Sequence, residues 1–439
     1  MTVKRISLRL ILLMLLFLIA CNITSPQLPA ATEASSSSTS TVPIAGDLGF
    51  GKVSGKVTDL STGMPLAGAT VTCEHFSYVP RETDSCNRST TTDQQGNFLF
   101  EDVSFHDTDT ITLTVQATGY NTTTSKYSSF TRAALEANVQ LIVTGSGTTA
   151  TSNGPVIANC PIFPTSNYWN ARVDSLPTHP MSDAWIDSIG RDAGFHLDFG
   201  SGEWDGGPIG IPYNIVAGST VPKVEVEFYY PEESDAGPHP IPENPNIEYG
   251  SDHHILMVDT DTCTLYEIYD ASFENGGWSG GSGAIWDLNS NALRPETWTS
   301  ADAAGLPILP GLVRYDEIAA GEIKHALRFT VEDTAGYIWP ARHLTSEAQA
   351  GIPPMGARFR LKANYDISDF PLAMQILLQA MKTYGIILAD NGSNWYVSGA
   401  PDERWDNDML HLLDVLTGAD FEAVDTSMLM VDMNSGEVK

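Results

Sequence analysis

Short hydrophobic runs separated by turn residues are the feature that most restricts the fold of this chain. Such runs recur throughout residues 156–425, and 37 glycines and 26 prolines interrupt the 439-residue sequence. β-Strands end at turn residues of this kind, whereas long helices would need an apolar stripe at helical spacing. The pattern predicts a mainly β protein whose large domain is a jelly roll or sandwich with a few peripheral helices.

The strands expected in the large domain are 209–216, 223–230, 253–259, 263–270, 311–315, 324–331, 357–363 and 385–390. Helices are expected at 182–189, 371–384 and 406–416. The second helix is apolar on nearly every side, so it should lie buried under a sheet. The segment 426–439 is expected to be a flexible tail.

The first 21 residues form a targeting segment. Basic residues precede an apolar run from Ile11 to Ala20, which is too short to span a bilayer stably. The run ends in Leu-Ile-Ala-Cys, which resembles the bacterial lipobox. This resemblance implies cleavage before Cys21 and a lipid on Cys21 that anchors the exported protein to the cell membrane. An ordinary signal peptide and an N-terminal anchor are the alternatives.

Two polar linkers divide the exported part of the chain. Residues 22–50 are rich in serine, threonine and proline, and residues 145–155 are rich in glycine, serine and threonine. Segments of this composition cannot bury a core and act as spacers. They separate a small β unit at 51–144 from the main domain at 156–425.

The small unit carries an ordered set of turn and core residues. From Gly55 it reads G-x-V-x-D-x-x-T-G-x-P-L-x-G-A-x-V, then T-D-x-x-G-x-F-x-F from Thr92, and it closes with N-V-Q-L. This order resembles the carboxypeptidase regulatory-like, or transthyretin-like, β-sandwich. The resemblance implies an Ig-like sandwich that acts as a rigid spacer or adhesive unit beside other domains.

Charge and missing motifs exclude several classes of function. The net charge of −31 repels phosphate backbones, which argues against nucleic acid as a partner. No phosphate-binding glycine loop, G-x-S-x-G elbow or H-E-x-x-H motif is present, which argues against nucleotide cofactors, serine esterases and zincin proteases. The acidic composition favours calcium as a cofactor, for example in the loop 402–408, although solubility alone also explains it.

Five cysteines divide between lipidation and disulfide bonds. With Cys21 lipidated, Cys73, Cys86, Cys160 and Cys263 remain in an oxidising compartment, and three pairings are open to them. We favour Cys73–Cys86 and Cys160–Cys263 because disulfides usually stay within a domain. None of these cysteines has the spacing of a structural zinc site.

Candidate catalytic residues lie on a predicted hairpin in the main domain. His253 and His254 open one strand and should point to opposite faces, and Glu267 on the next strand should lie beside them. A histidine–carboxylate pair can act as general base and orienting group, or can bind a metal ion. A purely structural pair is the alternative.

Asp302 and Arg328 add two charged side chains to the candidates. Asp302 lies in an uncharged stretch where desolvation would favour the protonated form that a general acid needs, although an Asx-turn or helix cap would also explain it. Arg328 on a strand face can hold a uronic-acid carboxylate or a structural acid. Asp287 is a further carboxylate, and Asp390 follows a buried strand on a predicted turn.

Tryptophans on glycine-rich loops suggest a sugar-binding surface. Trp286, Trp298 and Trp395 offer flat apolar faces, and Arg294 offers hydrogen-bond donors beside them. These four residues are the candidate substrate-binding wall, and ordinary core packing is the alternative for each tryptophan.

The sequence therefore predicts a lipid-anchored surface protein whose main domain binds, and as an enzyme would cleave, a polysaccharide. In the enzymatic version it is a glycoside hydrolase or polysaccharide lyase that uses His254, Glu267 and Asp302. A non-catalytic adhesion or scaffold protein of the cell envelope and a metal-dependent hydrolase are the alternatives. Residues 156–425 are also similar to uncharacterised secreted bacterial proteins, which implies an extracellular role.

Overall fold

The computed structural model describes residues 46–77, 86–144 and 154–439. Cys21, which is the predicted lipidation site, most of the first linker and residues 145–153 of the second lie outside the described residues. Strands make up 36% and helices 12% of the structure, which confirms the predicted mainly β class. Among the helices within the described ranges, none is long and apolar enough to cross a membrane.

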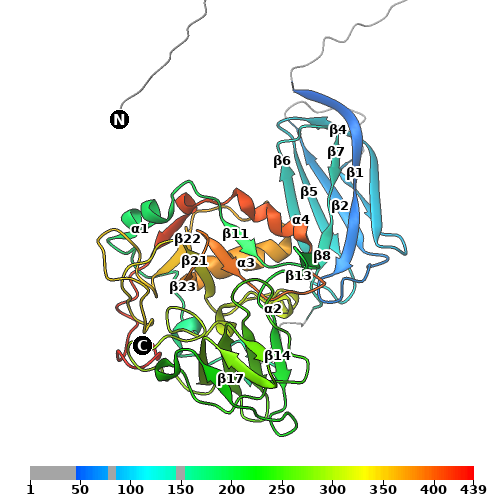
Figure 1. The fold of residues 1–439 in the computed structure, drawn as a ribbon. Helices are drawn as coiled ribbons and strands as arrows, with labels where there is room; N and C mark the ends of the chain where they lie inside the picture. Colours follow the sequence, from blue (N-terminus) through cyan, green and yellow to red (C-terminus); the bar gives the residue numbers. More distant parts are fainter. Residues whose placement is uncertain (1–45, 78–85, 145–153) are drawn as a thin grey trace, which may run out of the picture. The chain divides into compact units, whose positions relative to one another are not determined.

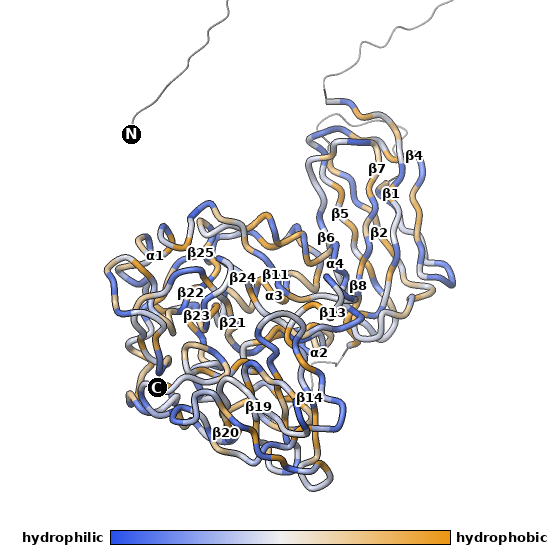
Figure 2. The backbone as a smooth tube through the Cα atoms, in the orientation of Figure 1, coloured by the Kyte–Doolittle hydropathy of each residue, from blue (hydrophilic) through white to orange (hydrophobic). Residues whose placement is uncertain are grey.

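The small unit is a sandwich of two four-stranded sheets (Figure 1). The first sheet contains β1 (Asp47–Asp59), β4 (Asn97–His106), β7 (Ala134–Glu136) and β8 (Val139–Leu141). The second contains β2 (Thr70–Phe76), β3 (Arg88–Thr91), β5 (Thr110–Gln116) and β6 (Thr123–Ser128). Hydrophobic and hydrophilic residues alternate along these strands (Figure 2), so one face of each sheet enters a common core.

The turn after β1 explains why the small unit has such a regular sequence. Asp59 accepts hydrogen bonds from the backbone nitrogens of Ser61 and Thr62, both at 2.8 Å, and from the hydroxyl of Tyr120 at 2.7 Å. Gly63 closes the turn at a φ of 68°, which side-chain-bearing residues rarely adopt. Local turn chemistry therefore fixes the spacing of the quoted motif.

The main domain is organised around a mixed six-stranded sheet with the order β11-β24-β21-β23-β22-β25. Its strands are β11 (His196–Asp198), β24 (Tyr396–Ser398), β21 (Leu327–Val331), β23 (Ile386–Asn391), β22 (Arg358–Leu361) and β25 (Phe421–Ala423). Helix α3 (Leu372–Thr383) joins β22 to β23 and buries most of its side chains, as its sequence predicts. Helix α1 spans Ser182–Ile189, matching its predicted bounds.

A second, four-stranded sheet has the order β14-β16-β17-β20. It consists of β14 (Tyr213–Val216), β16 (Ile255–Asp259), β17 (Thr264–Tyr269) and β20 (Ser282–Asp287). β16 and β17 form the predicted hairpin, with Asp259 opposite Thr264 at its turn. Short strands flank the two sheets: β9 (Val156–Ile157), β10 (Cys160–Pro161), β12 (Glu203–Trp204), β13 (Gly207–Pro208), β15 (Val226–Phe228), β18 (Ser272–Glu274) and β19 (Gly277–Gly280).

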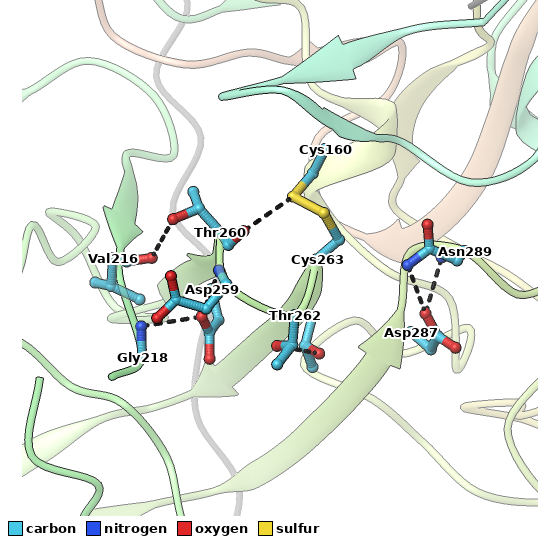
Figure 3. Close-up of a disulfide and its surroundings, with 11 residues drawn as sticks. Cys160, Val216, Gly218, Asp259, Thr260, Thr262, Cys263, Asp287 and Asn289 are labelled. Carbon is cyan, nitrogen blue, oxygen red and sulfur yellow. Dashed lines mark hydrogen bonds between the residues drawn. A yellow bond between two sulfur atoms is a disulfide. The ribbon is translucent and has the colours of Figure 1, made fainter. Parts of the chain in front are cut away.

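Two disulfides have the favoured pairing. Cys73–Cys86 lies within the small sandwich, and Cys160–Cys263 joins β10 to the β16–β17 hairpin (Figure 3). Hydrogen bonds support the same turn, because Asp259 accepts the backbone N–H of Gly218 at 3.0 Å. The start of the main domain is thus tied to its second sheet.

Three predicted elements differ from the structure. Residues 311–315 do not form a strand: Pro310 lies in the short helix η3 (Leu309–Gly311), and α2 (Tyr315–Ala320) follows. Proline cannot donate to a strand ladder, which explains the change. The predicted helix at 406–416 divides into α4 (Asn407–Leu410) and the 3₁₀ helix η4 (His411–Val415).

The segment 426–439 is not frayed. Arg342 donates to the backbone oxygen of Met433 at 2.7 Å, and the backbone nitrogen of Gly436 donates to Asn291 at 2.7 Å. The predicted flexible tail is therefore wrong, because hydrogen bonds with the rest of the domain satisfy its backbone groups.

Candidate functional site

A cleft runs between the two sheets of the main domain. It consists of two adjoining cavities of about 420 and 500 Å³, and both are lined by Asp252, Asp390 and Asn391. Small-molecule sites in proteins fall in this range of volumes. The cleft is therefore the natural place to look for chemistry.

The floor of the cleft is one face of the six-stranded sheet. Strand register places His196, Tyr396, Thr330 and Asp390 in one row across β11, β24, β21 and β23. Directly paired residues on neighbouring strands share a face, so these four side chains emerge on the same side. A second row on that face begins with Asp198, which pairs with Ser398.

Arg328 organises three polar side chains at the centre of the floor. Its Nε and Nη2 donate to the two carboxylate oxygens of Asp302 at 2.8 and 2.7 Å. The same Nη2 donates to Asp390 at 3.1 Å, and Nη1 donates to the hydroxyl of Ser398 at 2.6 Å. Arg328 and Asp302 are both buried, and four of the five N–H groups of the guanidinium donate to these three partners.

Asp390 differs from Asp302 because its carboxyl reaches the cleft. Its side chain is 21% exposed and contributes to both cavities. Burial, together with the neighbouring charge of Asp302, raises the pKa of Asp390 well above its ordinary value, despite the opposing effect of Arg328. Desolvation also raises the pKa of Asp198, whose exposed side chain lines the first cavity.

His254 lies in the wall of the cleft and is paired with a carboxylate. Its Nδ1 contacts Glu248, and its Nε2 lies 2.9 Å from the backbone oxygen of Ala301. Burial lowers the pKa of His254, but the hydrogen bond and charge of Glu248 outweigh burial and raise it to about 9. Near neutral pH, the pair is imidazolium and carboxylate. Its neighbour His253 is exposed, but neither histidine opens the strand as predicted, because β16 begins at Ile255 and His253 has a φ of 46°.

The same wall contains a possible set of metal ligands. One donor atom each from Glu248, Asp252 and His254 lie within 4.8 Å of one another. The hydrogen bond from Nε2 to the Ala301 carbonyl would orient the ring so that Nδ1 faces the metal ion. A metal ion would therefore compete with a proton for Nδ1.

Glu267 does not reach the cleft. Its fully buried carboxylate accepts hydrogen bonds from the backbone nitrogens of Ile308 at 3.0 Å and Leu309 at 2.9 Å. Burial raises the pKa of Glu267 to about 7, although these hydrogen bonds oppose the shift. Its position on β17 explains this burial, because the residues paired with it on the two neighbouring strands lie in the core. Of the three predicted catalytic residues, His254 and Asp302 line the cleft and Glu267 does not.

The predicted sugar-binding wall is not assembled. Trp395 is fully buried and stacks between Phe329 and Phe421, with ring centroids 5.8 and 5.3 Å away. Trp286 is also buried. An aromatic ring packs as well in a hydrophobic core as against a sugar ring, and the sequence does not distinguish these two environments.

Arg294 and Trp298 stand apart from the cleft as well. The buried guanidinium of Arg294 donates to Asp235 at 2.6 Å and lies 5.4 Å from the ring of half-buried Trp298. Arg294 therefore holds loops together, and neither residue lines the two cavities.

The cleft has exposed aromatic residues that the sequence did not single out. Trp204 is 76% exposed on the β12–β13 hairpin and lines the first cavity with Tyr249. The hydroxyl of Tyr249 donates to the backbone oxygen of Asp205 at 2.6 Å, and a Cβ on Gly207 would lie 2.0 Å from the Tyr249 ring. Glycine at 207 therefore allows the ring to pack flat on the hairpin. Tyr230 is exposed at the second cavity.

The acid-rich loop 402–408 is occupied by its own contacts. Asp402 accepts two hydrogen bonds from the side chain of Arg404, at 2.7 and 2.6 Å. Asp406 caps α4 by accepting the backbone nitrogen of Met409 at 3.1 Å. These bonds engage two of the four carboxylates in the loop.

Comparison with known proteins identifies one part of the chain. No curated protein matches it. Among solved structures, similar chains include catechol 1,2-dioxygenases from Acinetobacter radioresistens (in a mutant form) and Pseudomonas arvilla C-1, which are 15% and 16% identical over 26% and 28% of this chain, with TM-scores of 0.18 and 0.19. The matches span 57% and 60% of those chains.

A streptococcal ancillary pilin is 21% identical over 21% of this chain and 30% of its own, with a TM-score of 0.14. Similarity at these scores supports no inference about function. The model of one domain family does match, over residues 52–143, and it agrees with the two-sheet sandwich described above. Residues 52–143 of this chain are therefore a carboxypeptidase regulatory-like domain.

Proposed function

We propose that the main domain is a glycoside hydrolase that cleaves a polysaccharide at the cell surface. The observation that carries this proposal is the carboxyl pair of Asp302 and Asp390 at an open cleft. Arg328 binds both, and the pKa of the solvent-facing member is raised well above normal. A carboxyl with a raised pKa keeps its proton to higher pH, which is what a glycosidase needs to protonate its leaving group.

Asp390 is the proposed general acid and Asp198 the proposed general base. Asp390 gives its proton to the glycosidic oxygen as the bond from that oxygen to the anomeric carbon breaks. Asp198 takes a proton from a water molecule, whose hydroxyl joins the anomeric carbon. The products are two shorter sugar chains, and one water molecule is consumed. Overall, Asp390 has lost one proton and Asp198 has gained one.

The strand order favours inversion at the anomeric carbon. Asp198 and Asp390 lie three strand spacings apart across the sheet and two residues apart along the strands, so their backbones stand roughly 16 Å apart. Side chains that lean inward from this separation leave room for a water molecule. Inverting enzymes place their carboxyls roughly 6.5–9.5 Å apart, and retaining enzymes need about 5 Å.

Hydrolysis fits the site better than a lyase reaction. A lyase acting on a uronic acid needs a cation to neutralise the substrate carboxylate, and Arg328 was the candidate for this role. Four of its five N–H groups already donate to Asp302, Asp390 and Ser398. The acidic floor would instead repel an anionic sugar, so we expect a neutral polysaccharide.

The rim supports a sugar chain as ligand. Trp204 and Tyr249 at one cavity and Tyr230 at the other expose aromatic faces on which sugar rings can stack. A lipid on Cys21 would hold the protein at the outer face of the membrane, and the sandwich at 52–143 would act as a spacer. The cleft would then act on polysaccharide outside the cell.

The test is incubation of the protein with a panel of neutral and acidic polysaccharides. New reducing ends from a neutral member, lost in Asp390→Asn, would support the proposal. The anomeric configuration of the first product, read by NMR, tests inversion. Binding without cleavage would favour the adhesion or scaffold alternative, and unsaturated products would favour a lyase.

A metal-dependent hydrolase is the second candidate function. The grouping of Glu248, Asp252 and His254 in the cleft wall favours it. Elemental analysis of the purified protein and a chelation series separate the two candidates. Activity that disappears on chelation and returns with a transition metal would move the reaction to this wall, whereas metal-independent cleavage would remove it.

A further inference from the structure

A second group of side chains lies at the edge of the cleft floor, on different elements. It consists of His196 on β11 and of His411 and Asp414 on η4. One donor atom from each lies within 4.8 Å of the others. We propose that these three residues bind a divalent transition-metal ion, with zinc as the expected metal.

The local structure of η4 explains why two of the ligands face the same way. Leu410, Leu413 and Leu416 are buried at intervals of three residues, the period of a 3₁₀ helix. The residues one position further on, His411 and Asp414, therefore share the next face and are exposed. The same spacing that anchors η4 to the core aligns an imidazole and a carboxylate outside it.

The third ligand comes from the edge strand of the sheet. His196 pairs with Tyr396 across β11 and β24, and the two rings lie 4.6 Å apart. This contact limits the orientation of the imidazole, and its Nδ1 lies 3.6 Å from Asp414 Oδ1. His411 Nδ1 lies 3.0 Å from the other oxygen, Oδ2.

These separations match those of ligands around one zinc ion. Zinc lies about 2.0–2.2 Å from imidazole nitrogen and carboxylate oxygen, so tetrahedral ligands are roughly 3.3–3.5 Å apart. The observed 3.0 and 3.6 Å, measured to the two different oxygens of Asp414, lie on either side of this value, and one donor atom from each residue lies within 4.8 Å of the others. Two imidazoles and one carboxylate are a common zinc ligand set and leave a position for water.

Charge around the group also favours a cation. Among the described residues, no lysine or arginine forms a salt bridge with Asp414, whose ionic contacts are with the two histidines. The chain as a whole carries −31. A bound metal would fasten η4 to β11, the strand that also supplies Asp198 to the cleft floor.

The group differs from the histidine in the cleft wall. His254 has both ring nitrogens in hydrogen bonds within a buried pair, whereas His196 and His411 are partly exposed, with side chains 32% and 59% accessible. A metal can therefore reach the proposed site without displacing a buried ion pair. The inference does not depend on the proposed hydrolase activity.

The experiment is a zinc titration of the chelator-treated full-length protein in competition with a chromogenic chelator. We expect one zinc ion per chain with a Kd below about 1 µM, and a loss of affinity of at least about 100-fold in the H196A/H411A double variant. His106→Ala is the matched control, because His106 lies 2.8 Å from Asp107 in the small sandwich, outside the main domain. Zinc affinity should be unchanged in this control.

Asp414→Asn and Asp252→Asn complete the series. Asp414→Asn keeps the shape of the side chain and should weaken binding even where the double variant folds poorly. Asp252→Asn tests the cleft-wall group, so loss of the zinc there would assign the ion to that group and overturn the inference. Absence of zinc binding in the wild type, or unchanged binding in Asp414→Asn, would also overturn it. Cobalt(II) substitution supplies a visible spectrum that reports the ligand geometry directly.

Discussion

Glu267 and Asp390 are two largely buried carboxyl groups of one domain with opposite surroundings. Burial raises the pKa of both, to about 7 for Glu267 and well above the ordinary range for Asp390. Glu267 faces backbone N–H groups of residues 308 and 309 in the core, whereas Asp390 faces a cleft and shares Arg328 with a second acid. A perturbed pKa therefore indicates function only where the group can also reach a ligand.

The strongest test of this comparison is Asp390→Asn. The amide can keep a hydrogen bond with Arg328 but cannot supply a proton, so we expect polysaccharide cleavage to fall by about 10²–10⁴-fold with little change in stability. Rates on the cleaved substrate and thermal unfolding measure the two effects. Asp287→Asn, at an exposed carboxylate, is the control and should keep the wild-type rate. Equal rates in both variants would remove Asp390 from the mechanism.

Arg328→Ala tests the partner that the two acids share. It leaves the buried Asp302 without its counter-ion, which should cost about 3–5 kcal/mol of unfolding free energy. Arg172→Ala removes an exposed pair with Asp174, whose side chains are 63% and 39% exposed, and should cost at most about 1 kcal/mol. Urea denaturation measures both. Similar losses in the two variants would show that the buried network is not what stabilises the floor.

The pH dependence of stability tests the ion pair of Glu248 and His254 in the cleft wall. Its partner His254 has a folded pKa of about 9, above the ordinary 6.5. Their pairing therefore stabilises the fold fully below about pH 6.5, and this stabilisation is lost as pH rises through 9, by roughly 2–4 kcal/mol. Urea unfolding at several pH values should show the loss in wild type but not in a His254→Gln variant. A wild type with constant stability over this interval would contradict the ion pair.

Glu267→Ala should have the opposite effect to Asp390→Asn. It leaves the N–H groups of Ile308 and Leu309 without an acceptor, which costs about 1–3 kcal/mol each, while the cleft keeps its acids. We expect reduced unfolding free energy and a normal rate per folded molecule. Glu267→Gln retains one acceptor and should lose less stability. A selective loss of rate would return Glu267 to the catalytic residues.

Trp204→Ala has the smallest expected effect of the series, and Trp395→Ala is its contrast in the core. Trp204→Ala removes an exposed face at the cleft and should weaken polysaccharide binding by about fivefold, near 1 kcal/mol, without destabilising the fold. Trp395→Ala removes a core side chain and should cost about 3–5 kcal/mol of stability. Calorimetric binding and denaturation distinguish them. Unchanged binding in Trp204→Ala would exclude its hairpin from the sugar path.

Features encoded by neighbouring residues could be predicted from the sequence. The turn after Asp59, the hairpin from Asp259 to Thr264 and the apolar helix α3 each depend on residues close in the chain, so patterns and turn chemistry indicate them. The disulfide pairings followed from domain boundaries.

The candidate site could not be predicted in the same way. Asp198 and Asp390 are about 190 residues apart in the sequence, and the strand order β11-β24-β21-β23 places both on one floor, where Arg328 also binds Asp302 from a separate loop. No local pattern encodes that order. Asp390 stood out only as a polar residue at the end of an apolar strand, and Trp204 carried no signal that separates it from a core tryptophan such as Trp395.

The Cys160–Cys263 disulfide has a consequence for how the protein is produced. It closes a loop of 103 residues, and cross-links of that length remove about 4.7 kcal/mol of chain entropy from the unfolded state. That amount is a large share of the stability of an ordinary domain. We therefore expect recombinant main domain made in a reducing cytoplasm to accumulate as misfolded or protease-sensitive material. Secretion into an oxidising compartment, or refolding with a thiol–disulfide buffer, should restore soluble yield.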